Sequence, residues 1–139
     1  MAIQYSPQVG QILMCDFKGM KEPEMVKRRP VIVTRSSRKG PKLVQIACLS
    51  TAKPEPTLNH HMHIEDKFLP RDDFFQGKET WLKGDMLYTV SFDRLDYIRL
   101  GRDNQKRIYF KQSLSRENMR KVLSCVLHGM NLGHLCEHL

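Results

Sequence analysis

The pattern of apolar residues changes once along this 139-residue chain, and that change limits the folds open to it. Up to residue 110 the apolar residues come in short runs bounded by glycine, proline and polar turns, as β-strands do. The runs lie at 10–17, 31–34, 43–49, 61–64, 87–92 and 108–110. Beyond Ser115, a suitable helix N-cap, they recur at helical spacing from Met119 to Met130. We therefore expect a mainly β fold, a small antiparallel barrel or curled sheet with a C-terminal helix packed across it.

The length and composition fit one soluble domain spanning residues 1–139, with 40% hydrophobic and 27% charged residues. The N-terminus has no basic region followed by an apolar run, and no apolar stretch approaches the roughly 20 residues that cross a bilayer. We expect a cytoplasmic protein without membrane association. Four cysteines without a CxxC pair are expected to be reduced and mostly buried: Cys15, Cys48, Cys125 and Cys136.

The positive charge is concentrated near the N-terminus. The chain has a formal net charge of +8, and residues 1–50 contribute +6 of it, from nine Lys and Arg against three Asp and Glu. Such a basic region indicates a polyanionic partner, most simply a nucleic acid. The alternative is a solvated basic surface that only aids solubility.

Two adjacent arginines precede the strand at 31–34. Pro30 cannot donate to a strand ladder, so we expect it at the first position of that strand. Arg29 would then be held where loop becomes sheet, and its planar guanidinium matches phosphate geometry. The sequence therefore predicts a phosphate-directed site at this end of the strand.

Further polar residues lie at the ends of other predicted strands. Ser50 and Thr51 end the strand at 43–49, and Lys83-Gly84-Asp85 precedes the strand at 87–92, with Gly84 permitting a close backbone approach. A cation, a hydroxyl and a carboxylate on one rim could cleave RNA without a metal, by holding the phosphate and accepting the proton of the attacking 2′-hydroxyl. Each residue alone also has a structural explanation, such as an ion pair or a strand cap.

Nucleotide-binding glycine motifs and the serine-hydrolase motif are absent from the sequence. The histidines fall into two groups without structural zinc spacing. The run from His60 to His63 is expected to line a loop or strand, with a catalytic role as the lesser alternative. The sequence His134-Leu135-Cys136-Glu137-His138 could hold a metal but also fits a plain C-terminal tail, so we expect no metal site.

Five ordered segments resemble the PemK/MazF family of toxins from type II toxin–antitoxin systems: 10–17, 23–33, 49–51, 81–86 and 90–96. The resemblance covers nearly the whole chain and is weakest at 52–80 and 98–112. It implies an SH3-like barrel of the CcdB/PemK/MazF type, usually a homodimer. It also implies a sequence-specific endoribonuclease that cuts single-stranded mRNA without metal or cofactor, leaves 2′,3′-cyclic phosphate and 5′-hydroxyl ends, and pairs with a cognate antitoxin.

The resemblance also assigns roles to residues. It makes Arg29 the phosphate-stabilising and proton-donating group and Ser50 the residue that supplies the hydroxyl. Many members have threonine in place of Ser50, and the neighbouring Thr51 could substitute for it. The general base stays open between Glu24 and Asp85, since Pro23 replaces a loop histidine of the PemK branch. The expected RNA-binding residues are Lys27, Arg28, Thr51 and Lys83. Lys83 stands where that branch has arginine. Either Lys83 acts as a point charge, or Arg28 and Arg29 supply the bidentate contacts to phosphate.

Two other functions compete with this one. A basic SH3-like module could bind RNA or a protein partner without cutting, with an affinity that depends on salt. The gyrase-poisoning CcdB toxins share the implied fold but depend on a Trp-Gly-Ile tail, whereas this chain ends in Glu137-His138-Leu139.

Overall fold

The structure is a computed structural model that describes residues 3–36, 39–72 and 74–139. Its strands are β1 (Ile12–Asp16), β2 (Arg28–Ser36), β3 (Leu43–Ser50), β4 (His61–Ile64), β5 (Thr80–Ser91), β6 (Leu95–Tyr97), β7 (Arg99–Asp103) and β8 (Lys106–Tyr109). One α-helix, α1 (Arg116–Gly129), follows them. Three short 3-10 helices lie at Asp66–Phe68, Phe92–Arg94 and Gly133–His138.

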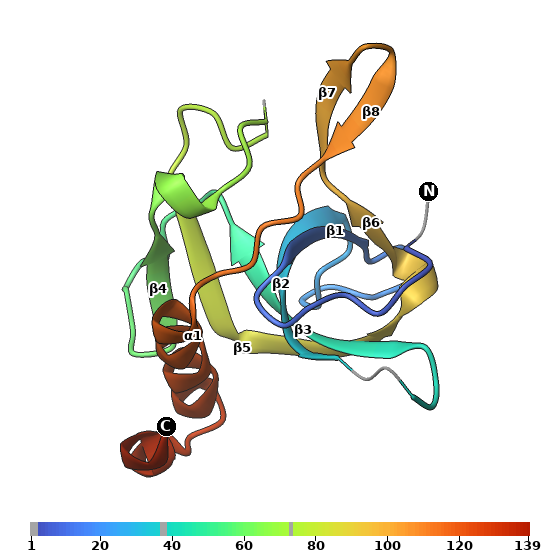
Figure 1. Cartoon of the computed structure of the whole chain (residues 1–139). Coiled ribbons are helices and arrows are strands. Elements are labelled where there is room, and N and C mark those ends of the chain that lie inside the picture. The colour runs from blue at the N-terminus through green and yellow to red at the C-terminus, as the bar shows by residue number, and fades with distance from the viewer. Residues whose placement is uncertain (1–2, 37–38, 73) are drawn as a thin grey trace.

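Six of the strands form one antiparallel sheet in the order β4-β5-β3-β2-β1-β6. The sheet curls on itself like a small barrel, with β4 and β6 as its two edges, and β7 and β8 form a separate ribbon that projects from it (Figure 1). This architecture confirms the expected fold, mainly β and barrel-like with a C-terminal helix.

The two faces of the sheet bury different sets of residues. We call the concave side the inner face; its buried residues include Leu13, Cys15, Val31, Val33, Ile46, Cys48 and Val90. We call the other side the helix face; its buried residues include Ile12, Ile32, Ala47, Leu49 and Leu82, and they pack with Met119, Val122, Cys125 and Val126 of α1. Strand residues alternate between the two faces, as the period of two in a β-strand requires.

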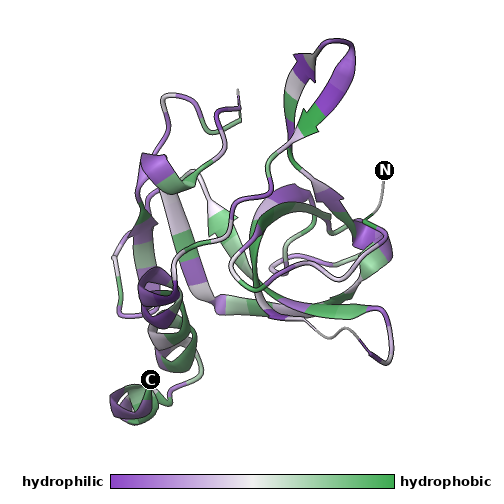
Figure 2. Cartoon of the chain, viewed as in Figure 1, coloured by the Kyte–Doolittle hydropathy of each residue, from purple (hydrophilic) through white to green (hydrophobic). Residues whose placement is uncertain are grey.

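Helix α1 forms where the sequence predicts it. The Ser115 hydroxyl accepts a hydrogen bond from the Asn118 N–H at 3.2 Å, which caps the first turn. The helix ends at Gly129. Figure 2 shows its apolar side turned toward the sheet and its polar side turned away. Of the described helices, none has the length and apolar character that crossing a membrane requires.

Three details differ from the prediction. The strand expected at 87–92 begins at Thr80, so Lys83-Gly84-Asp85 lies inside β5 and does not precede it. Pro30 is the third residue of β2, because Arg28 and Arg29 already pair with β1. Strands β6 and β7 were not expected, because they are short and lack a sustained β-branched run. The cysteines are as predicted: all four are free, and only Cys136 is not fully buried.

Candidate RNA-cleaving site

The first residues of β2 direct two arginines to opposite faces of the sheet. Arg29 pairs in register with Cys15 of β1, a buried residue of the inner face, and directly opposed residues share a face. Arg28 pairs with Asp16, on the other face, and forms an exposed ion pair with Asp96 at 3.3 Å. The half-buried Arg29 side chain has no hydrogen bond or ion pair with any residue that the structure describes. Its guanidinium is thus free to bind a ligand at the inner face.

Ser50 is the last residue of the neighbouring strand, β3. The β2–β3 ladder pairs Val31 with Cys48, and two further steps along it place Ser50 opposite Arg29. The Ser50 hydroxyl accepts a hydrogen bond from the Ala52 N–H at 3.1 Å, which turns the chain away as the strand ends. The sheet therefore places a half-buried hydroxyl next to the guanidinium of Arg29, on the same face. Thr51 lies just beyond the strand and is also half-buried.

A bulge in β5 follows Lys83, which lies on this inner face, and contains Asp85. Cys48 of β3 pairs with Lys83, but Ala47 pairs with Leu87, so residues 84–86 are extra residues of β5. A Cβ atom on Gly84 would lie 2.5 Å from the Cys125 carbonyl oxygen, so this position faces α1. Lys83 pairs with Cys48 and therefore shares its face. Asp85 lies within the bulge, where the alternation of strand faces is interrupted.

The electrostatics of Cys48 support this placement. Burial raises the pKa of the Cys48 thiol to about 12, and among the smaller effects Lys83 lowers that pKa while Asp85 raises it. Both charges are therefore close to a residue that lies two positions from Ser50 on the inner face. Along a strand this separation is about 7 Å. Lys83 lies opposite Cys48, and Asp85 follows it along β5, farther from the level of Ser50, which pairs with Trp81.

Two histidines of the 52–80 segment join Asp85. The His60 Nε2 atom lies 3.5 Å from the Asp85 carboxylate, and the His60 and His61 rings are 4.2 Å apart between centroids. His61 pairs in register with Lys83. Burial lowers the pKa of His61, and the nearby His60 lowers it further. Next to Lys83, the sheet thus carries an imidazole–carboxylate pair, an arrangement that can accept and release protons.

Sequence reasoning noted this histidine run but missed its partner. His60 and Asp85 are far apart along the chain, and only the register of β4 on β5 brings them together. His60, His61 and Asp85 also offer three ligand atoms within 4.8 Å of one another, a grouping that could hold a metal ion. The Leu58 N–H, however, donates to His61 Nδ1 at 3.0 Å, so that nitrogen is already occupied. The tail residues His134, Cys136 and His138 form no such group within the described chain.

The loop before β2 holds the remaining candidates. The Glu24 carboxylate accepts a hydrogen bond from the Lys21 N–H at 3.0 Å, and the side chain is exposed. The Met25 N–H donates to the Tyr88 hydroxyl at 3.2 Å, which ties the loop to β5. Lys27 is exposed at the end of the loop. Glu24 is therefore engaged with its own loop, whereas Asp85 is engaged with His60.

Together these residues give the inner face a defined chemistry. Arg29 and Lys83 supply positive charge, Ser50 a hydroxyl, and Asp85 with His60 a proton acceptor. Such a set can neutralise a phosphate and take up a proton from a nearby hydroxyl. Nothing in this set requires a bound nucleotide cofactor.

Comparison with known proteins finds a family and two relatives that match most of the chain. Residues 8–129 match the family described as PemK-like, MazF-like toxin of type II toxin–antitoxin system. The chain is 30% identical to the uncharacterized protein YifN of Escherichia coli (strain K12), over 94% of this chain and 96% of YifN. It is 27% identical to an uncharacterized protein of Haemophilus influenzae, with 96% of both chains covered.

Solved structures share the fold at low sequence identity. MazF from Deinococcus radiodurans superposes with a TM-score of 0.61 at 11% identity, over 92% of this chain and 99% of MazF. An endoribonuclease from a mycobacterial species, solved in complex with its cognate antitoxin, superposes with a TM-score of 0.58 at 15% identity. That match covers 91% of this chain and 96% of the mycobacterial chain.

Proposed function

This chain belongs to the PemK-like, MazF-like toxins of type II toxin–antitoxin systems, and on that premise we propose that it is an endoribonuclease that cleaves single-stranded RNA at its inner face. The observation that carries the proposal is the position of Arg29 and Ser50 on neighbouring strands, each two residues beyond the Val31–Cys48 pair. Adjacent strands bring a guanidinium without a protein partner next to a hydroxyl on the same face. A phosphodiester is the ligand that suits this pair best.

The reaction needs no external nucleophile. The 2′-hydroxyl of the substrate loses its proton and attacks the adjacent phosphorus, forming the P–O2′ bond of a 2′,3′-cyclic phosphate. The P–O5′ bond breaks, and the leaving 5′ oxygen takes up a proton to become a 5′-hydroxyl. Arg29 stabilises the negative charge that develops on the phosphoryl oxygens and donates toward the leaving oxygen. Ser50 orients the phosphate by a hydrogen bond, and Lys83 attracts the neighbouring phosphates of the RNA as a point charge.

Asp85 is the stronger candidate for the proton acceptor. Its carboxylate is held by His60, which could relay the proton, while the Glu24 carboxylate accepts a hydrogen bond within its own loop. Lys27 and Thr51 remain the RNA-binding residues that we propose beside this site, and Arg28, on the other face of β2, would bind RNA outside the inner face. If Asp85 is the base, Asp85→Asn lowers cleavage more than Glu24→Gln does; the reverse order would assign the role to Glu24.

The proposal extends to partners and location. The mycobacterial relative of this fold was solved with its cognate antitoxin, and we place an antitoxin with an acidic segment over the basic inner face. The same reasoning makes this chain a homodimer in the cytoplasm, where messenger RNA is the available substrate. A basic domain that binds RNA without cutting it is the competing function.

Ser50 provides the first test. Purified protein is incubated in EDTA with a defined single-stranded RNA, and the fragments are resolved by length. The wild type is expected to cut at specific positions, and Ser50→Ala is expected to cut about 10- to 100-fold more slowly, a loss typical of one missing hydrogen bond to a transition state. Ser50→Thr keeps the hydroxyl and should retain most of the activity.

The outcomes separate the competing functions. RNA that stays intact with the wild type, yet is bound with a salt-dependent affinity, would identify the non-cutting module. Equal cleavage by the wild type and Ser50→Ala would remove Ser50 from the site and leave the activity itself intact.

A further inference from the structure

The ribbon of β7 and β8 carries unusual charge for a free-standing element. It projects from the sheet away from α1, and it is largely hydrophilic toward its tip (Figures 1 and 2). Residues 99–109 contain one aspartate against four cations: Arg99, Arg102, Lys106 and Arg107. All four cations are exposed, and none has an ion-pair partner within the part of the chain that the structure describes. The ribbon therefore has an excess of positive charge, four cations against one carboxylate.

Two of these arginines face each other across the ribbon. Arg102 pairs directly with Arg107 in the β7–β8 register. Like charges placed directly opposite one another destabilise a strand pair. An isolated two-stranded ribbon is itself only marginally stable. Side chains so placed are about 5 Å apart at Cβ. A phosphate between the two guanidiniums would replace this repulsion with charge-assisted hydrogen bonds from both sides.

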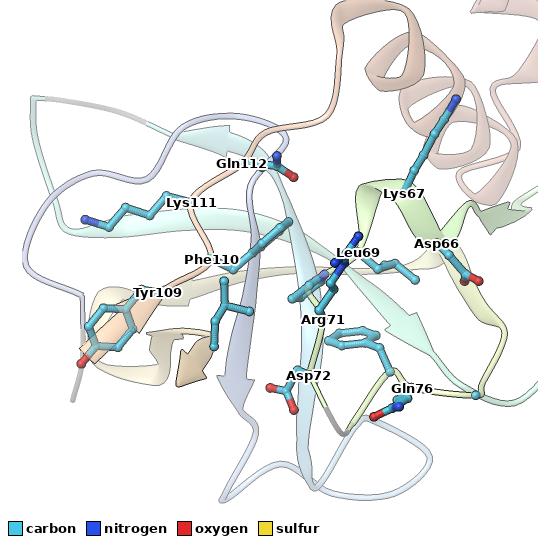
Figure 3. A pocket seen from close by; sticks show the side chains of 14 residues that line it. Asp66, Lys67, Leu69, Arg71, Asp72, Gln76, Tyr109, Phe110, Lys111 and Gln112 are labelled. Carbon is cyan, nitrogen blue, oxygen red and sulfur yellow. The ribbon is translucent and has the colours of Figure 1, made fainter. Parts of the chain in front are cut away.

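The base of the ribbon continues this surface toward the body of the protein. The Tyr97 and Tyr109 rings are 6.2 Å apart between centroids, and the Lys111 ammonium lies 5.4 Å from the Tyr97 ring. Beside them lies an open groove of about 990 Å³ between the ribbon and residues 66–72 and 75–77 (Figure 3). A partly exposed tyrosine and a nearby cation suit the stacking of a base and the contact of its phosphate.

The groove itself distinguishes between two kinds of polyanion. Lys67, Arg71 and Lys111 line it, but so do the carboxylates of Asp66 and Asp72. An acidic peptide would meet repulsion from those carboxylates and gain nothing from them. A nucleic acid gains contacts from both signs, since the amino groups of bases donate to carboxylates while phosphates bind the cations.

We propose that the Arg102–Arg107 pair is a phosphate clamp that holds the RNA backbone outside the cleavage site, with the adjoining groove receiving the neighbouring nucleotides. The proposal rests on the proposed endoribonuclease function and adds a second contact region to it. It assigns the clamp to substrate binding and not to the chemical step, so long RNAs depend on it and short ones do not.

The test compares two variants of equal charge. Arg102→Gln/Arg107→Gln removes the clamp, and Arg35→Gln/Lys42→Gln removes two exposed cations near the far ends of β2 and β3 from Arg29 and Ser50. The probe is a fully 2′-O-methylated single-stranded RNA of about 20 nucleotides, which is longer than the stretch that one small domain usually covers. Methylation blocks the 2′-hydroxyl, so binding is measured without cleavage. The affinity is measured at several salt concentrations, beside the melting temperature of each free variant.

The clamp variant is expected to bind on the order of 10-fold more weakly than the wild type at about 0.1 M salt. The slope of log K against log salt should become shallower by about 1.4, since each single-strand phosphate contact contributes about 0.7. The melting temperature should stay equal or rise, because a repulsive pair has been removed. With cleavable RNA, KM should rise for a long substrate and kcat should stay the same.

Three results would overturn the proposal. Affinity and salt slope equal to those of the wild type would show that the ribbon does not touch RNA. Equal losses in both variants would reduce the effect to overall charge. A loss of binding to poly-L-glutamate with unchanged binding to RNA would assign the ribbon to an acidic protein partner. Failure of the proposed function is distinguishable, because the wild type would then leave cleavable RNA intact.

Discussion

Replacing Arg29 with alanine is expected to lower the rate of RNA cleavage by about 10²- to 10³-fold, the loss seen when one transition-state donor is removed. The guanidinium has no described protein partner, so the substitution breaks no structural contact. The melting temperature of Arg29→Ala should therefore stay within about 2 °C of the wild type, as for a surface substitution without a structural role. Cleavage is measured on a defined RNA under single-turnover conditions.

Two matched variants sharpen this experiment. Arg28→Ala removes the adjacent guanidinium, which lies on the other face of β2 and pairs with Asp96. Arg28→Ala should fold normally, since an exposed ion pair contributes little to stability. Its cleavage should fall only a few-fold, mainly through a higher KM. Arg29→Lys keeps the charge but loses the planar fork, so its activity should fall between those of alanine and wild type. Wild-type activity in Arg29→Ala would remove this residue from the mechanism.

Replacing Gly84 with alanine is expected to destabilise the fold by about 2–3 kcal/mol, the upper range for inserting a group into a packed site. The added Cβ would lie 2.5 Å from the Cys125 carbonyl oxygen and 2.9 Å from that of His60. Both obstacles are backbone atoms that cannot rotate away. Helix α1 crosses β5 here, and from the helix side a Cβ on Gly129 would lie 2.7 Å from the Asp85 nitrogen. The melting temperature should fall by roughly 5–12 °C for a domain of this size.

Gly19 provides the matched control for this prediction. A Cβ there meets nothing within 4 Å, but the φ angle of +95° disfavours any side chain. Gly19→Ala should therefore cost only about 1 kcal/mol, from backbone strain alone. Equal melting temperatures for Gly84→Ala and the wild type would show that α1 does not cross β5 as closely as described. Cleavage should also fall in Gly84→Ala, because Lys83 and Asp85 flank the crossing.

The local pattern of the sequence accounts for most of the fold. β-Branched runs marked β2 and β3, and apolar residues at helical spacing marked α1. The start of β5 was misplaced, because Trp81 to Met86 lacks an alternating pattern: Gly84 has no side chain, and the bulge shifts the alternation by extra residues. Tertiary pairing with β3 and β4 fixes this strand, and pairing of that kind leaves no local signal.

Site residues at the end of a single strand could be predicted from the sequence. Contacts that depend on the register between two strands could not. Arg29 and Ser50 could be proposed from their positions next to β-branched runs, and each lies two residues beyond the Val31–Cys48 pair of the ladder. The His60–Asp85 contact required the register of β4 on β5, which no spacing in the sequence encodes. The facing arginines of the ribbon were hidden for the same reason, since only the register sets Arg102 against Arg107.

The most direct test of RNA cleavage at the inner face uses one modified substrate. A single-stranded RNA that the wild type cuts at a known bond is prepared again with 2′-deoxyribose at the nucleotide on the 5′ side of that bond alone. If the 2′-hydroxyl is the nucleophile, that bond stays intact while other cut sites in the same molecule are cleaved at their usual rate. Cleavage at the deoxyribose position, with a 5′-phosphate on the product, would contradict this account, because it would require an external water molecule as the nucleophile.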